Sequence, residues 1–136
     1  MTLNDLYQEA AKQNITIRER NLPDGYYGVY YHPKRLIVLD EGLLEYQQKC
    51  ALCHELVHAH YGDDGCFIST KAEIRARKVT ALRLISLEDY KALEKIYSNM
   101  DYLIACELEV TLEILQDYKR YYLENLFCKS TCYKHV

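Results

Sequence analysis

The chain of 136 residues is long enough for one domain with a buried core, and we expect residues 1–136 to form a single domain. Its formal net charge of −3 argues against a surface that binds nucleic acid directly. No run of residues has the length of a membrane span, and the first fourteen residues do not resemble a signal peptide, so we expect a cytoplasmic protein without membrane contact.

The N-terminal part predicts a helix followed by a small antiparallel sheet. Residues 2–14 have the apolar spacing of a short amphipathic helix. Residue types and alternation predict three strands, the last two joined as a hairpin: Ile15–Ile17, Tyr27–Tyr31 and Arg35–Leu39. Within the last strand, Leu36–Leu39 is the candidate sheet edge to which an extended substrate chain would pair.

The middle of the chain predicts a buried helix that ends at a cluster of helix breakers. Residues 43–53 contain no proline or glycine, and apolar side chains continue at helical spacing as far as Tyr61. The helix must end near Gly62–Gly65. Cys50 and Cys53 lie on its apolar stripe, so we expect buried core thiols and not a redox pair.

This helix carries the pentad His54-Glu55-Leu56-Val57-His58. Two histidines four residues apart lie on the same face of a helix, where both imidazoles can bind one metal ion. The glutamate between them lies beside that metal and can take a proton from a water molecule there. This arrangement is typical of zinc hydrolases, so we predict Zn²⁺ as the cofactor, His54 and His58 as ligands and Glu55 as the catalytic base.

A third zinc ligand is expected from the next helix, because a catalytic zinc usually has three protein ligands and one open position. That helix is predicted over residues 70–85, with Ser69 or Thr70 as its N-cap. Its first turn carries Glu73, and the small side chain of Ala76 would allow close approach of the first helix. We interpret Glu73 as the third ligand; the alternative is that it only favours the helix N-terminus electrostatically.

The remainder of the chain is predicted to be helical. A helix from Ser86 to about Tyr97 precedes two helices, 101–107 and 112–126, that resemble a helix-turn-helix. Residues 100–126 carry six acidic and two basic side chains, so this pair is expected to be structural or protein-binding. Two other features are left open: Cys66 as a loop thiol or a resting ligand, and the C-terminal cluster of Cys128, Cys132 and His135, which would lack a fourth ligand for a second zinc.

Together these elements predict an α+β fold. A small antiparallel sheet would pack on a zincin-like helix pair in residues 1–85, followed by a C-terminal helical bundle in residues 86–136.

The pentad, followed by Lys71–Ala76 and Thr80–Ile85, resembles the ImmA/IrrE family of metallopeptidases. The resemblance also covers three flanking segments: Leu22–Gly25, Gly28–Leu39 and Leu103–Thr111. Three positions depart from the family pattern without removing a ligand or the base: Cys53 where alanine is usual, Arg77 where an acid is frequent, and Ser86 where proline often ends the helix. The resemblance implies a protein of phages or mobile elements whose substrate is a helix-turn-helix repressor.

We therefore predict a zinc-dependent endopeptidase that hydrolyses a bond in a specific protein. The oxyanion needs a second donor besides zinc, and His32, His60 and Tyr61 remain open for that role, although spacing turns His60 away from the metal. Other function classes also remain open. The protein could be a non-catalytic antirepressor with a structural zinc, the toxin of a toxin–antitoxin pair, or a helical domain in which the pentad is incidental.

Overall fold

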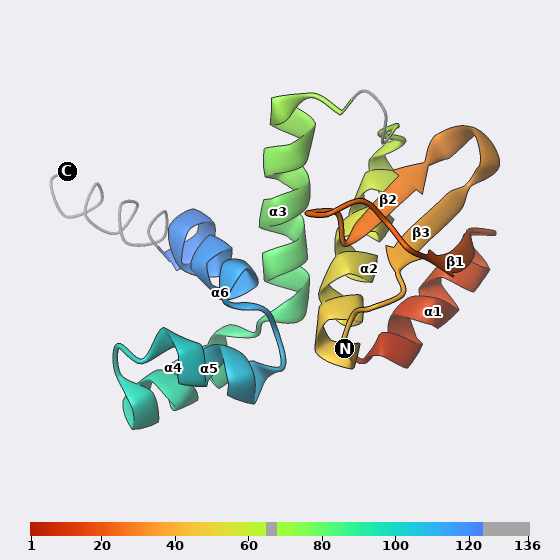
Figure 1. The fold of residues 1–136 in the computed structure, drawn as a ribbon. Coiled ribbons are helices and arrows are strands. Elements are labelled where there is room, and N and C mark those ends of the chain that lie inside the picture. Colours follow the sequence, from red (N-terminus) through yellow and green to blue (C-terminus); the bar gives the residue numbers. More distant parts are fainter. Residues whose placement is uncertain (65–67, 124–136) are drawn as a thin grey trace, which may run out of the picture.

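The computed structural model describes residues 1–64 and 68–123 (Figure 1). Cys66 and the cluster of Cys128, Cys132 and His135 lie outside the described residues. The described elements, in chain order, are α1 (Leu3–Lys12), β1 (Thr16–Arg20), β2 (Gly28–Tyr31), the 3₁₀ turn η1 (His32–Lys34), β3 (Leu36–Asp40), α2 (Glu45–Tyr61), α3 (Thr70–Leu84), α4 (Leu87–Tyr97), α5 (Asp101–Leu108), α6 (Leu112–Tyr118) and the π-helical turn η2 (Lys119–Leu123).

The predicted α+β class is confirmed, but the sheet is mixed and not antiparallel. Its strand order is β1-β3-β2, with β3 antiparallel to β2 and parallel to β1. The prediction that Leu36–Leu39 forms a sheet edge is therefore wrong, because these residues belong to the central strand β3, whereas β2 is an edge strand. The hairpin through η1 fixes only one neighbour of β3. Residue alternation along β1 reports which face is buried but not the direction in which that strand pairs.

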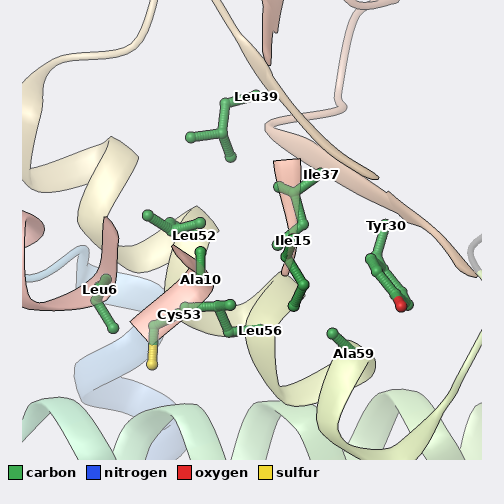
Figure 2. Packing of buried hydrophobic residues seen from close by; sticks show 10 residues of the cluster. All are labelled: Leu6, Ala10, Ile15, Tyr30, Ile37, Leu39, Leu52, Cys53, Leu56 and Ala59. Carbon is green, nitrogen blue, oxygen red and sulfur yellow. The ribbon is translucent and has the colours of Figure 1, made fainter. Parts of the chain in front are cut away.

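Helices α1 and α2 cover one face of the sheet and form the first apolar core with it (Figures 1 and 2). The core residues shared by these elements are Leu6, Ala10, Ile15, Tyr30, Ile37, Leu39, Leu52, Cys53, Leu56 and Ala59. Burial of these side chains provides the main stabilisation of this part of the fold. It also fixes α2 against the sheet, so that the pentad has a defined position relative to β2.

A second apolar core lies between α3 and the C-terminal helices. Its members include Cys50 from α2 and Ala81 from α3, packed with Ile104, Leu115 and Tyr118 of α5 and α6. Cys50 and Cys53 are both buried, which confirms their predicted place in the core. The cores are contiguous, because the partly buried Leu84 of α3 packs against both of them.

The ends of the two central helices follow from local sequence, as predicted. Gly62 ends α2 in the left-handed conformation, with φ of 70°, which glycine adopts without the steric cost that a Cβ brings. The Ser69 hydroxyl accepts a hydrogen bond from the Ala72 N–H and begins α3. The chain therefore turns back after α2, and α3 packs along α2. No helix among residues 1–64 and 68–123 is long and apolar enough to cross a membrane.

Candidate active site

Three of the predicted site residues meet between α2 and α3. The Nε2 atoms of His54 and His58 are 3.2 Å apart. Glu73, in the first turn of α3, places Oε1 2.9 Å from His54 Nε2 and Oε2 3.0 Å from His58 Nε2. Candidate ligand atoms of all three residues lie within 4.8 Å of one another. Three side chains from two helices thus converge on one point.

The donor set fits a zinc ion. Ligand atoms about 2.1 Å from a tetrahedral metal lie about 3.4 Å from each other, and the 3.2 Å between the two Nε2 atoms is close to that value. Each imidazole also has one Glu73 carboxylate oxygen within 3.0 Å. Two imidazole nitrogens and one carboxylate are a known ligand set of catalytic zinc. Hydrogen bonds from His54 and His58 hold the pKa of Glu73 far below its ordinary range, so its carboxylate is ionised and ready to bind a cation.

Glu55 lies on α2 between the two histidines and is buried, with 7% of its surface exposed. Burial raises the pKa of its carboxyl group, and the neighbouring histidines only partly oppose that rise. A carboxylate with a raised pKa holds an abstracted proton more readily than an exposed one. The buried environment thus favours the protonated form of this carboxyl group in the metal-free protein.

Strand β2 passes directly over Glu55. A Cβ at Gly28 would lie 3.2 Å from Glu55 Cγ and 3.1 Å from Leu39 Cδ2, so any larger residue would force these side chains to move at this approach of the strand. A backbone hydrogen bond from Tyr30 favours the ionised form of Glu55. The Glu55 side chain, which comes from α2, therefore lies between that helix and the edge strand β2. Gly28 is not among the site residues predicted from sequence; its signal there is a glycine near the start of a predicted strand.

Asp63 lies against the buried His58, which is 1% exposed, and Arg75 binds Asp63 in turn. Asp63 Oδ2 accepts a hydrogen bond from His58 Nδ1 at 3.0 Å, on the side of the ring opposite to the ligand atom. Burial disfavours the charge on Asp63, but the hydrogen bonds from His58 and Arg75 outweigh it and lower the pKa of its carboxyl group. Neither residue is predicted from sequence, because the local pattern around Asp63 indicates only a helix breaker.

The site opens into a groove of about 1600 Å³. The groove is lined from β2 at one end to α5 and α6 at the other, with the pentad and Glu73 between them. This volume exceeds the roughly 300–1,000 Å³ of a small-molecule pocket and suits a stretch of polypeptide. Six carboxylates and two basic side chains line it, which makes it acidic: Glu45, Glu55, Glu73, Glu109, Glu113 and Asp117, with Lys49 and Arg77.

The three residues considered for oxyanion stabilisation do not line this groove. His60 and Tyr61 border a separate small pocket behind α2, and His32 Nδ1 is hydrogen-bonded to the Tyr30 hydroxyl at 2.8 Å. His32 therefore acts as a turn residue, and Tyr61 lies under the Arg75 guanidinium, 3.9 Å from Cζ to the ring centroid.

The family model described as the IrrE N-terminal-like domain, of the M78 peptidases, matches residues 10–117. The chain belongs to this family. The match covers both α2 and α3 and confirms the resemblance stated from the sequence. It supports a metallopeptidase of the zinc type. No curated protein and no solved structure matches the chain.

Proposed function

We propose that this protein is a zinc-dependent endopeptidase in which His54, His58 and Glu73 hold the metal and Glu55 is the general base. The observation that carries the proposal is the convergence of the three ligand atoms next to a buried glutamate with a raised pKa. Zinc in this position supplies Lewis acidity, which polarises a carbonyl group and makes a water molecule more acidic.

Glu55 would move the proton in this reaction. Its ionised carboxylate, stabilised by the backbone of Tyr30, takes a proton from the attacking water. The burial that raises its pKa then allows it to keep that proton until the leaving amine accepts it. Asp117 and Glu113 also line the groove, and both pair with Arg77.

The free edge of β2 is the surface on which the substrate chain would lie. The Tyr27 carbonyl accepts from the Asp40 N–H, and paired residues alternate along an antiparallel ladder, so the backbone groups of Gly28 and Tyr30 point away from β3. The Tyr30 N–H is bonded to Glu55, which leaves the backbone groups of Gly28 and the Tyr30 carbonyl for a substrate chain. An extended peptide can pair with such an edge as an added strand. In this pose the scissile bond would lie next to Glu55, because a Cβ added at Gly28 would lie 3.2 Å from Glu55 Cγ.

The charge of the groove supports a basic substrate. Carboxylates outnumber basic side chains in the groove. Besides the acids of the candidate site, Glu45, Glu109 and Glu113 line it. A DNA-binding repressor is rich in lysine and arginine because it contacts phosphates. A helix-turn-helix repressor of a phage or mobile element therefore fits the groove, and we propose it as the substrate.

The test is incubation of the zinc-loaded protein with the repressor encoded beside its gene, followed by mass spectrometry of the products. We expect one or a few specific cuts, and we expect Glu55→Gln to bind the repressor but leave it intact. Relief of repression by Glu55→Gln as efficient as that by the native chain would instead identify an antirepressor that works by binding. Growth arrest that depends on Glu55 in the absence of the neighbouring gene would point to a toxin.

A further inference from the structure

We propose that Asp63 and Arg75 form a positioning clamp that sets the orientation and tautomer of the His58 imidazole for zinc binding. The clamp consists of these two side chains together with His58 and the Tyr61 ring. It rests on the proposed zinc site and adds to that site two residues that do not touch the metal. Neither residue would be a catalytic residue, since both act through His58.

The first half of the clamp is the contact between Asp63 and His58. Asp63 lies two residues beyond the end of α2, and its Oδ2 is 3.0 Å from His58 Nδ1. The side chain of His58 is 1% exposed and that of Asp63 is 14% exposed, so little water competes for this hydrogen bond. In the metal-free site Nε2 donates to Glu73 Oε2, and a metal would take the place of that proton. A proton held on Nδ1 by the carboxylate then leaves the lone pair on Nε2, which is the atom that faces His54 and Glu73.

The second half fixes Asp63 from the neighbouring helix. Arg75 Nη2 lies 2.9 Å from Asp63 Oδ1 and 3.0 Å from Asp63 Oδ2. The guanidinium stacks on the Tyr61 ring with its Cζ 3.9 Å from the centroid, which restricts it further. The carboxylate is thus held by α3 and by the last turn of α2 at the same time.

The clamp links two ligands that come from different helices. Arg75 lies two residues after Glu73 on α3, and Asp63 lies five residues after His58 at the end of α2. Any change in the spacing of the helices at this end would move Arg75 and Glu73 together. The separation of His58 and Glu73 is therefore set on both sides of the imidazole, by the Nδ1 contact and by the ligand contact.

The arrangement is specific to one of the two histidines. Within residues 1–64 and 68–123, the hydrogen bonds of His54 involve only its Nε2, whereas His58 uses both ring nitrogens. The Arg75 side chain is 39% exposed, and an ion pair of that exposure contributes little to stability. If the Asp63–Arg75 ion pair had only a structural role, its removal would change neither stability nor zinc affinity by much. The clamp predicts instead that its removal lowers zinc affinity.

The experiment is competition for zinc between the purified protein and a chromophoric chelator. The variants are Asp63→Ala, Asp63→Asn and Arg75→Met, with Asp24→Asn as a control in an exposed turn. Loss of such a contact typically weakens zinc binding about 10- to 100-fold, and we expect that range for Asp63→Ala. Asp63→Asn should lose less because its amide oxygen still accepts from Nδ1, Arg75→Met should lose a few-fold, and the control should match the native chain.

Thermal unfolding of the zinc-free variants and visible spectra of their cobalt forms separate positioning from folding. The clamp predicts unchanged zinc-free melting for Asp63→Asn and Arg75→Met, with shifted cobalt bands. Zinc affinity of Asp63→Ala within twofold of the native chain overturns the clamp but leaves the zinc site intact. Zinc-free melting that falls in step with affinity in all three variants also overturns it in favour of a folding role. Failure of the native chain to bind zinc overturns the proposed function as well.

Discussion

Gly28→Ala adds one methyl group at the point where the edge strand passes over the general base. The new Cβ would lie 3.1 Å from Leu39 Cδ2, 3.2 Å from Glu55 Cγ and 3.5 Å from the Val38 carbonyl oxygen. Carbon atoms in ordinary contact are about 3.5–4.0 Å apart, so Leu39 and Glu55 must each move by about 0.3 Å or more. Both are buried, which leaves them little room to do so.

The size of the effect follows from that displacement. Overpacking of a core by one methyl group costs about 1–3 kcal/mol of unfolding free energy, and we expect about 1–2 kcal/mol because the strand is at a sheet edge. A misplacement of about 1 Å in a catalytic constellation can cost about 100-fold in rate. A shift of about a third of that in Glu55 corresponds to a loss of about 3- to 10-fold in kcat/KM. Zinc affinity should not change, because Gly28 contacts none of the three ligands among its nearest atoms.

Three assays test this prediction on one pair of variants. Urea denaturation followed by circular dichroism gives stability, chelator competition gives zinc affinity, and repressor cleavage gives kcat/KM. Gly42→Ala is the matched control, since its Cβ would meet only Asp40 Oδ2 at 3.4 Å. A Gly28→Ala protein with native stability and native activity would refute the close approach of β2 to Glu55. Loss of zinc affinity would show that the strand acts on the ligands and not on the base.

Three further predictions concern the ion pairs, the thiols and the response to pH. Arg77→Met leaves the buried carboxylate of Asp117 without its two hydrogen bonds of 3.0 and 2.6 Å, and we expect it to lower the free energy of unfolding in urea by about 2–3 kcal/mol. The double variant with Asp117→Leu should restore most of that loss. A loss under about 0.5 kcal/mol, on the order of an exposed pair, would contradict the prediction. Burial raises the pKa of the Cys53 thiol to about 12. Iodoacetamide at pH 8 should therefore label the exposed Cys106 long before Cys53, which peptide mass mapping would show. Equal labelling of the two thiols would mean that the core is open to the reagent. Hydrogen bonds from the two imidazoles of the site lower the pKa of Glu73 in the zinc-free protein. The ionised Glu73 therefore stabilises the fold fully above its unfolded pKa of about 4.3, and this stabilisation falls as the pH drops from there toward the lower pKa of the folded state. The stability of the native chain relative to Glu73→Gln should rise from pH 3 to pH 5, and a difference that stays flat would count against the contact between Glu73 and the imidazoles.

The helices, and the side chains that meet at the candidate site, were accessible from sequence because each depends on local patterns. The pentad fixes its own geometry once it is helical, since residues four apart share a face. Gly62 and Ser69 give the end of α2 and the beginning of α3 by backbone conformation and capping alone. The position of Glu73 then follows from the turn between the helices, and the structure places its carboxylate against both histidines.

The features that were not accessible depend on contacts between distant segments. The parallel pairing of β1 with β3 joins strands that are separated in the chain by β2, and residue alternation is the same for either direction. The close approach of Gly28 to Glu55 joins residues 27 positions apart, and nothing in the local pattern of either reports it. Asp63 is read locally as a helix breaker, and only the fold shows that its carboxylate faces His58 while Arg75 faces it from α3.

The most direct measurement is the metal content of the purified chain by elemental mass spectrometry, together with that of His58→Ala and Glu73→Gln. The account predicts about one zinc per native chain, as three ligands and an open position require, and far less zinc in both variants after the same dialysis. A native chain that stays free of metal even when zinc is supplied would contradict it. Full zinc occupancy in both variants would place the metal elsewhere in the chain and would contradict it equally.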